Sequence, residues 1–481
     1  MKKLSILALS AFAMTTIGLV SCTKDFVETN TNKNGASSAQ PESLVTPALI
    51  KVLQANQTRA LRLTNELMQV HVTNINTDEI HRYIIRPNES EYMWSNWYTQ
   101  RTNFLDIYKG GALVGNKTWM GIGRILDVWV MSLITDLYGD VPYTEANNGK
   151  EGNFQPKFDK QSDIYPDLFK KLEEANELLT AKQAVTDSTL EMLYNGNADR
   201  WRKFGNSLYL RLLLRASKKD EVAIAAKMQE IVSTPAKYPI FNDNSESAIF
   251  KFTVVAPYVT AFNTYREYDF NGDNSLCSYF INNLKEWEDP RIDKWAVKVS
   301  GEYQGLASGY EPTNAPTARL SYYNKNLMNE PMMGNIINYP ELQFILAEAA
   351  LKGYITGDAK SYYEKGVASA ITLWGLTVPT NYLTHEGINW TEATNDNEKM
   401  EKIHVQKYYT LFFTDFQQYH EYRRTGFPVM PIGPGVQNNK IMPTRFRYPI
   451  TVQSLNATNY KKAVAEMGGP DDMLTKVWWN K

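Results

Sequence analysis

The spacing of apolar residues along the chain predicts a mainly α-helical protein. Residues 163–179 show this pattern clearly, because apolar side chains recur there at steps of three or four and fall on one helix face. These residues are Ile164, Leu168, Leu172, Ala175 and Leu179. No long alternation of apolar and polar residues, which would indicate β-strands, competes with such patterns.

Residues 199–217 predict a second amphipathic helix. Its core-facing residues are Trp201, Phe204, Leu208, Leu212 and Leu213. We expect Arg202, Arg211 and Arg215 to lie outside the core or at helix ends. Asp199 is well placed to cap the N-terminus or to act as a first-turn acid.

Residues 339–375 predict a helical hairpin. The first helix should end near Gly353, the turn contains Gly357, and the second helix carries Ala359, Tyr363 and Gly366. This spacing of small and aromatic residues is similar to the second helix of a tetratricopeptide unit, in which small residues let two helices approach closely. Because this is the single copy that can be recognised, we expect some tetratricopeptide-like hairpins but no regular repeat array.

The middle of the chain, residues 236–325, has a different composition. It is rich in Gly, Pro, Asn, Tyr and Asp, and it predicts long irregular loops. Loops of this length inside a domain are usually functional or disordered. Their aromatic content argues against disorder.

The N-terminus has the features of an exported lipoprotein. Lys2 and Lys3 precede an apolar run that is too short for a secure membrane span, and Leu19-Val20-Ser21-Cys22 is similar to a bacterial lipobox. We therefore predict a signal peptide at 1–21, acylation of Cys22, a polar tether over 22–42 and a single domain at 43–481. The alternative is that Cys22 packs in a first hydrophobic helix.

Charge and motif content exclude several function classes. The formal net charge is −1 without a clustered basic excess, which argues against nucleic-acid binding. The five histidines show no metal-ligand spacing, and no nucleophile motif is present, so we predict no cofactor and identify no catalytic motif. Glu341 and Glu348 lie on one helix face about 10 Å apart, slightly beyond the separation of glycosidase carboxylates. A hydrogen bond from Glu348 to a neighbouring helix end is the simpler interpretation, although distant carboxylates could still form a glycosidase.

Aromatic residues supply the candidate binding site, because the chain contains 29 Tyr and 11 Trp. Tyr and Trp rings can stack on sugar rings or hold peptide side chains, while nearby polar groups bind hydroxyls. The first candidate cluster contains Tyr83, Arg86, Asn88, Tyr92 and Trp94, ahead of a helix expected to begin near Ser95. The second contains Tyr258, Tyr265, Arg266, Tyr268 and Phe270. Trp97 and Tyr98 continue a helical pattern and are predicted to be core residues, and core packing remains an alternative for each single aromatic.

Several segments together resemble a known family. In chain order they are residues 133–146, 158–175, 201–217, 287–293, 339–354, 406–428 and 445–460. In this order they resemble the SusD/RagB-type nutrient-binding lipoproteins of the Bacteroidota. The C-terminal elements Arg445-x-x-Tyr448-Pro449 and Asn456-x-x-Asn459-Tyr460 are similar to one branch of that family.

This resemblance implies an α-rich SusD-like domain on the outer face of the outer membrane. Such proteins cap a SusC-like TonB-dependent transporter, bind oligosaccharides or in some members peptides, and have no catalytic activity. The resemblance also implies structural roles for Tyr138, Gly139, Pro142, Tyr143, Arg423, Arg424, Arg445, Tyr448 and Pro449. The predicted function is therefore nutrient capture at the cell surface, and the alternatives are a surface-anchored glycan hydrolase and a transporter-docking lipoprotein without its own ligand.

Overall fold

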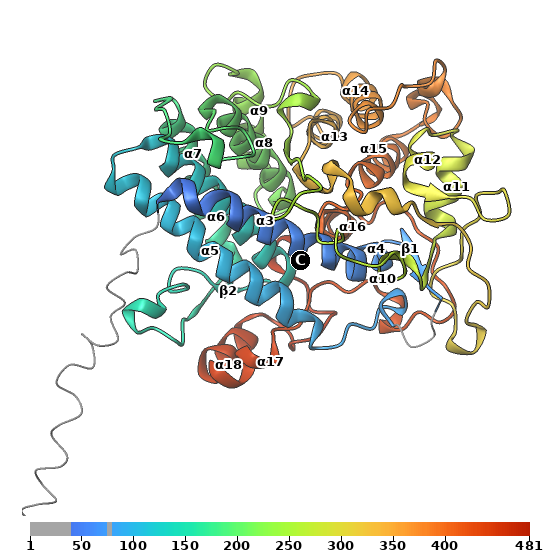
Figure 1. Ribbon diagram of the computed structural model, residues 1–481, viewed down its shortest axis with the longest axis horizontal. Helices are drawn as coiled ribbons and strands as arrows, with labels where there is room; N and C mark the ends of the chain where they lie inside the picture. Colours follow the sequence, from blue (N-terminus) through green and yellow to red (C-terminus); the bar gives the residue numbers. More distant parts are fainter. Residues whose placement is uncertain (1–39, 75–78) are drawn as a thin grey trace, which may run out of the picture. The chain divides into compact units, whose positions relative to one another are not determined.

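The computed structural model describes residues 40–74 and 79–481, which pack around one large hydrophobic core and a small second cluster of Val72, Cys277 and Tyr310. The main helices are α3 Pro41–Arg59, α5 Glu89–Leu113, α6 Lys117–Tyr138, α7 Gln161–Leu179, α8 Ala198–Ala216, α9 Glu221–Ser233, α13 Tyr339–Leu351, α14 Ala359–Thr372 and α15 Asp396–Thr410. Shorter helices are α4 Asn65–Leu67, α10 Glu267–Asn271, α11 Ser278–Glu286, α12 Arg291–Trp295, α16 Gln417–Thr425, α17 Ile450–Leu455 and α18 Ala457–Glu466, and a π-helical segment covers Ala60–Thr64. Figure 1 shows α5 and α6 running side by side through the body of the domain. The prediction of a mainly helical fold is confirmed.

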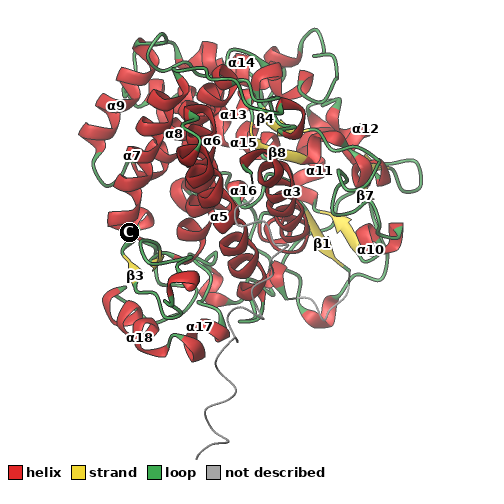
Figure 2. Cartoon of the chain, turned by 60° about the vertical axis from the view of Figure 1, so that its left-hand side comes forward, coloured by secondary structure: helices red, strands yellow, loops and turns green. Residues whose placement is uncertain are grey.

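The described strands are short and pair two by two. They are β1 His71–Thr73, β2 Val141–Pro142, β3 Phe158–Asp159, β4 Ala248–Phe250, β5 Asn274–Leu276, β6 Ala296–Val297, β7 Tyr322–Tyr323 and β8 Gly334–Ile337. The antiparallel pairs are β1 with β5, β2 with β3, β4 with β8, and β6 with β7. In the first pair His71 lies opposite Leu276 and Thr73 opposite Asn274. The pairs β1–β5 and β4–β8 join segments distant in sequence. Figure 2 shows the strands as small additions to a helical body.

The predicted N-terminal features lie mostly outside the described residues. The signal peptide and Cys22 are among residues 1–39, which are not described. The predicted tether extends to residue 42, whereas α3 already begins at Pro41, where proline is favourable in a first helical turn. Among the described residues, helices fall short of the length and apolarity that a membrane span requires.

Helix α6 forms the centre of the core. It begins where the Asn116 side chain accepts a hydrogen bond from the Trp119 backbone, and it ends at Gly139, whose positive φ of 88° suits a residue without a Cβ. Nearly every residue between Thr118 and Tyr138 is buried, because α5, α7 and α8 surround the helix. Such burial requires an apolar sequence on all sides of the helix.

The two helices predicted from apolar spacing are α7 and α8. All of the apolar residues assigned to their core faces are buried. Asp199 lies in the first turn of α8, but the cap is Asn197, whose side chain accepts from the Arg200 backbone. Arg215 lies in the last turn of α8, as predicted for a helix end, although it is buried there. The prediction is wrong for Arg211, which is buried in the middle of the helix.

Ion pairs explain why these arginines are buried. Arg211 donates to both carboxylate oxygens of Glu341 at 2.7 and 2.6 Å. Arg215 lies 2.6 Å from Asp136, which also accepts from Tyr165 and Trp479. Periodicity predicted the positions of these side chains on the helix, but their partners come from distant segments. A buried charge with such a partner keeps its ionised form in the core.

The family motif residues lie at buried junctions between segments. Arg445 donates to the Tyr138 carbonyl at 3.0 and 3.1 Å, and the Tyr448 hydroxyl donates to the Asp140 carbonyl at 2.6 Å. Asp140 in turn accepts from the Gln161 backbone at 2.8 Å and so caps α7. These contacts join the end of α6 to the C-terminal segment, in agreement with structural roles for the motif.

The predicted hairpin consists of α13 and α14. The first helix is followed by Gly353 at a positive φ of 71°. Gly366 faces the first helix so closely that a Cβ there would lie 2.8 Å from the Phe344 ring. Close approach at a small residue is therefore the feature that lets this tetratricopeptide-like pair form.

We expect Gly366→Ala to destabilise the domain by about 1–3 kcal/mol, because the added methyl group overpacks against a buried ring. Urea denaturation followed by circular dichroism would measure the change. Gly149→Ala is a suitable control, since a Cβ there meets a single atom, of Phe154, at 3.8 Å. Equal stability of the wild-type and Gly366→Ala proteins would contradict the close packing of the hairpin.

Candidate ligand-binding site

The first aromatic cluster does not form a loop. Helix α5 begins at Glu89, so Tyr92 and Trp94 lie within it, and the prediction of a start near Ser95 is wrong. Glu89 and Glu91 occupy the first turn, where carboxylates interact favourably with the helix dipole. The many polar residues near the start of the helix hid its apolar pattern.

The remaining members of that cluster lie around the start of α5. Tyr83 is buried in a left-handed turn with a φ of 64°, and Asn88 is the exposed residue that precedes the helix. Arg86 is exposed and forms an ion pair of 2.9 Å with Glu79. The structure therefore does not bring these five residues into one binding surface.

Trp94 forms the floor of a pocket of about 450 Å³, here called the Trp94 pocket. The Trp94 ring packs against Tyr98 and Tyr138, with ring centres 4.9 and 5.1 Å apart. Tyr98 was predicted to be a core residue, but it is half-buried and lines this pocket, and its hydroxyl donates to the Pro142 carbonyl at 2.6 Å. Sequence periodicity could not reveal this, because the pocket is completed by distant residues.

The rim of the Trp94 pocket is made by two segments that hold each other in place. The Asn456 amide donates to the Pro156 carbonyl at 2.7 Å, next to the junction of α17 and α18. Figure 2 shows this end of the chain beside β3. Phe154 and Leu455 line the rim with exposed fractions of 78% and 71%. The pocket is therefore rigid at its floor and apolar at its mouth.

The second aromatic cluster contributes to another pocket, of about 420 Å³, here called the Arg59 pocket. Tyr265 and Tyr268 line one side, and the end of α3 with the π-helical segment lines the other. Tyr268 is 63% exposed, and its hydroxyl donates to Asp273 at 2.8 Å. The antiparallel pair β1–β5 brings these two segments together, although they are about 200 residues apart in sequence.

Charged groups in the Arg59 pocket are paired with one another. Arg59 and Arg62 both bind the Glu89 carboxylate, at 2.9 and 2.8 Å. Burial lowers the pKa of Arg59, partly offset by Glu89. The Arg59 guanidinium also lies 4.1 Å from the Tyr92 ring centre, so Tyr92 supports the position of Arg59 without lining the pocket itself.

The other predicted residues take different positions. Arg266 pairs with Asp269 at 2.6 Å, and hydrogen bonding from Arg266 lowers the pKa of Asp269, which lines the Arg59 pocket. Tyr258 is half-buried and lines neither pocket. Arg59 and Arg62 were missed because nothing in the spacing of a long helix marks its last turns as a binding surface.

Comparison with known proteins places this architecture in a family. The model of a family described as starch-binding and associating with the outer membrane matches residues 33–449. The chain belongs to the SusD-like family. None of the curated proteins matches this SusD-like sequence.

Solved SusD homologues have the same fold. One from Bacteroides fragilis has a TM-score of 0.80 at 22% identity, covering 92% of this chain and 100% of its own. A chitin-binding protein has a TM-score of 0.78 at 25% identity, with coverage of 92% and 100%. A chitin-binding SusD homolog from Flavobacterium johnsoniae has a TM-score of 0.79 at 21% identity, with coverage of 92% and 98%.

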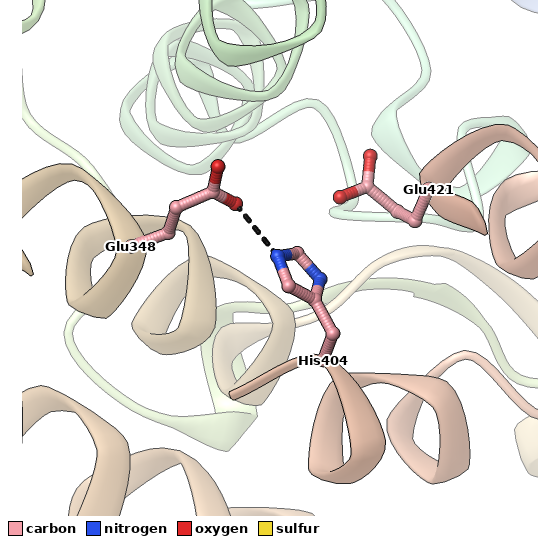
Figure 3. A group of neighbouring side chains, drawn as sticks. All are labelled: Glu348, His404 and Glu421. Atoms are coloured by element: carbon pink, nitrogen blue, oxygen red, sulfur yellow. Dashed lines mark ion pairs between the residues drawn. The ribbon is translucent and has the colours of Figure 1, made fainter. Parts of the chain in front are cut away.

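One further group of side chains in this SusD-like domain has the composition of a metal site. Figure 3 shows Glu348, His404 and Glu421 converging from three helices. Their ligand atoms lie within 4.8 Å of one another, and all three residues are buried. Positions 348, 404 and 421 show no metal-ligand spacing, so the tertiary structure alone brings them together.

The charges around this group do not suit a divalent cation. Arg424 binds both carboxylates, and Lys407 and Arg215 bind Glu421 at 2.8 and 3.1 Å. His404 Nε2 lies 3.1 Å from the Glu348 carboxylate. These cations already compensate the negative charge of the carboxylates. They would repel a metal ion, and they occupy the carboxylate oxygens that the ion would need as ligands. The group is a structural charge network.

This network should make the free energy of unfolding depend on pH in the acid range. Burial alone would raise the pKa of Glu348, but Arg424 and His404 hold it well below its ordinary value of 4.5. Below about pH 4.5 the unfolded chain takes up a proton at this carboxyl before the folded protein does, so the stabilisation falls until the folded carboxyl also titrates.

We expect Glu348→Gln to lower the free energy of unfolding by about 3–5 kcal/mol at pH 7, because it removes one partner of a buried pair. The difference from wild type should shrink as the pH falls below about 4.5. Urea titrations at a series of pH values would measure it. Glu177→Gln, at an exposed glutamate, is the matched control. A difference that is independent of pH would contradict the depressed pKa.

Proposed function

We propose that this SusD-like protein is a cell-surface lipoprotein that captures oligosaccharides in the Arg59 pocket. In this proposal it passes them to a SusC-like TonB-dependent transporter in the outer membrane. The observation that supports it most is the exposed Tyr268 ring beside the paired polar groups of the Arg59 pocket. The family description and the chitin-binding homologues support a glycan ligand.

The Arg59 pocket has the chemistry that a sugar ring needs. Its tyrosine rings offer apolar faces to the C–H groups of the ring. Arg62, Asp273 and Asn274 offer donors and acceptors to hydroxyl groups. Because most charges in the pocket already pair with each other, an uncharged ligand fits better than a strongly acidic or basic one. This favours a neutral oligosaccharide over a charged peptide.

A hydrolytic function has little support. The SusD-like family is a family of binding proteins. Glu341 and Glu348, the carboxylates considered for catalysis, are buried and bind Arg211 and Arg424. Buried ion pairs of this kind have no access to a glycosidic bond. A third function, docking to a transporter without a ligand, is favoured by the exposed apolar rim of the Trp94 pocket.

The proposed lipid anchor would hold the binding domain at the membrane surface. A lipobox cysteine carries more than one acyl chain, and more than one chain is needed for stable anchoring. The polar residues between Cys22 and the start of α3 would then join the anchor to the domain. In this arrangement a ligand bound at the surface stays close to the transporter.

We expect Tyr268→Ala to weaken oligosaccharide binding by about tenfold, because a stacking surface of the Arg59 pocket is removed. Isothermal titration calorimetry with starch and chitin oligosaccharides and with neutral peptides would measure the change. Tyr258→Ala is the matched control, since Tyr258 lies in the same segment but outside the pocket. Loss of binding in the control alone would place the site elsewhere.

We expect Cys22→Ala to abolish retention in washed outer membranes and to leave ligand binding by the released protein unchanged, because the thiol is the acylation site. Fractionation and immunoblotting of cells that lack the partner transporter would test this. Ser21→Ala keeps a small residue before the cysteine and should retain the protein at the membrane. Membrane retention of the Cys22→Ala protein would rule out the lipid anchor.

A further inference from the structure

A third pocket lies away from the two described above. It has a volume of about 370 Å³, within the range of about 300–1,000 Å³ that is typical of small-molecule sites. It lies between α11 and the N-terminal half of α15, and a loop around Gly387 closes one side. Figure 1 shows α11 and α15 on the same side of the domain. It is called the Trp287 pocket below and shares no lining residue with the Arg59 pocket or the Trp94 pocket.

Two aromatic residues form one wall of the Trp287 pocket. The Trp287 ring packs edge-on against Tyr409 with centres 5.4 Å apart, and the Tyr279 ring packs against Tyr408 at 5.8 Å. Trp287 is 6% exposed and lines the pocket. A Cβ at Gly387 would lie 2.7 Å from the indole nitrogen, so glycine lets this loop pass close to the ring. The wall is rigid and aromatic.

The opposite wall carries an excess of negative charge. Glu392, Glu398 and Glu401 line the pocket, whereas Lys402 is the one basic residue among the lining residues. Lys402 is already engaged, because its ammonium binds Glu392 at 2.8 Å and the Gly387 carbonyl at 3.1 Å. Glu392 and Lys402 therefore neutralise each other, and two carboxylates remain.

Glu401 is the carboxylate best placed for a ligand. Glu398 uses one oxygen to accept from the backbone and hydroxyl of Thr394. Glu401 is half-buried and has no ion pair with a described residue. Burial raises the pKa of the Tyr279 phenol, and the negative charge of Glu401 is the next largest cause of this increase. The two side chains therefore lie close together, and both line the pocket. A half-buried carboxylate next to aromatic rings attracts an organic cation.

We propose that the Trp287 pocket binds a protonated primary amine. Glu401 acts as the counter-ion, and the rings of Trp287 and Tyr279 pack against the carbon atoms next to the nitrogen. A divalent metal ion fits less well, because it prefers a shell of oxygen ligands and gains little from aromatic walls. The proposal goes beyond oligosaccharide capture in the Arg59 pocket, since it concerns a separate site and a charged ligand.

Both an amino sugar and a lysine side chain carry a protonated primary amine, so either could be the ligand of this pocket. Calorimetry of the purified protein with glucosamine trisaccharide and with the tripeptide Gly-Lys-Gly would distinguish the sources. Binding of either probe supports the amine site and assigns its source, and binding of neither probe overturns the proposal. The N-acetylated trisaccharide and acetyl-lysine peptide are the uncharged counterparts.

We expect Glu401→Gln to weaken binding of the amine probe by about tenfold or more, since the substitution removes the counter-ion and keeps the side-chain shape. Glu177→Gln, which changes the net charge equally at an exposed glutamate outside the pocket, should leave the affinity unchanged. Binding of the acetylated trisaccharide, which the Arg59 pocket would account for, should not respond to Glu401→Gln.

Two further outcomes would overturn the amine site and leave the proposed oligosaccharide site intact. One is equal affinity of the wild-type and Glu401→Gln proteins for the amine probe. The other is an equal effect of Glu177→Gln, which would indicate a long-range charge effect. Amine binding that persists in Tyr268→Ala would show that the two pockets are independent, whereas its loss there would place the amine in the Arg59 pocket.

Discussion

The arrangement of helices depends on buried charged side chains, each of which must lie next to a side chain of opposite charge. Arg215 of α8 binds Asp136 of α6 and Glu421 of α16, and all three residues are buried. Arg424 connects the same region to Glu348 of α13. An unpaired charge at such a position would cost several kcal/mol, so the helices can pack together only in an arrangement that satisfies every pair. Apolar burial supplies most of the stabilisation, and the charges select the packing.

This central network fixes the positions of the surface sites. Helix α5 packs against α6, lines the Trp94 pocket through its first three turns and supports the Arg59 pocket through Glu89. Glu89 holds Arg59 and Arg62, and Trp94 forms the floor of the Trp94 pocket. Because both sites rest on the same rigid helix, the proposed oligosaccharide site and the Trp94 pocket keep a constant separation.

The three pockets differ in chemistry although aromatic rings line all of them. Paired charges surround the rings of the Arg59 pocket, apolar groups surround those of the Trp94 pocket, and unpaired carboxylates face those of the Trp287 pocket. Aromatic faces hold carbon skeletons without strong selectivity, so the neighbouring polar groups decide what binds. Under the proposals above, one SusD-like domain would present separate surfaces to a sugar, a protein and an amine.

The sequence by itself determined the local features of the protein. Apolar spacing predicted α7, α8 and the α13–α14 hairpin, because a 3.6-residue period is a local property of the chain. The order of the motifs indicated the SusD-like fold, and the lipobox at Cys22 remains a prediction from sequence. The start of α5 was misplaced, since its early turns are rich in polar residues.

The tertiary structure alone decided which residues share a site. Tyr92 and Trp94 are neighbours in sequence but serve different pockets, because helical geometry directs them to different faces. Arg59 meets Tyr265 through tertiary contacts such as the pairing of β1 with β5, and Arg211 and Arg215 are buried because carboxylates on distant helices reach them. Such contacts join segments tens to hundreds of residues apart, and no periodicity in the sequence records them.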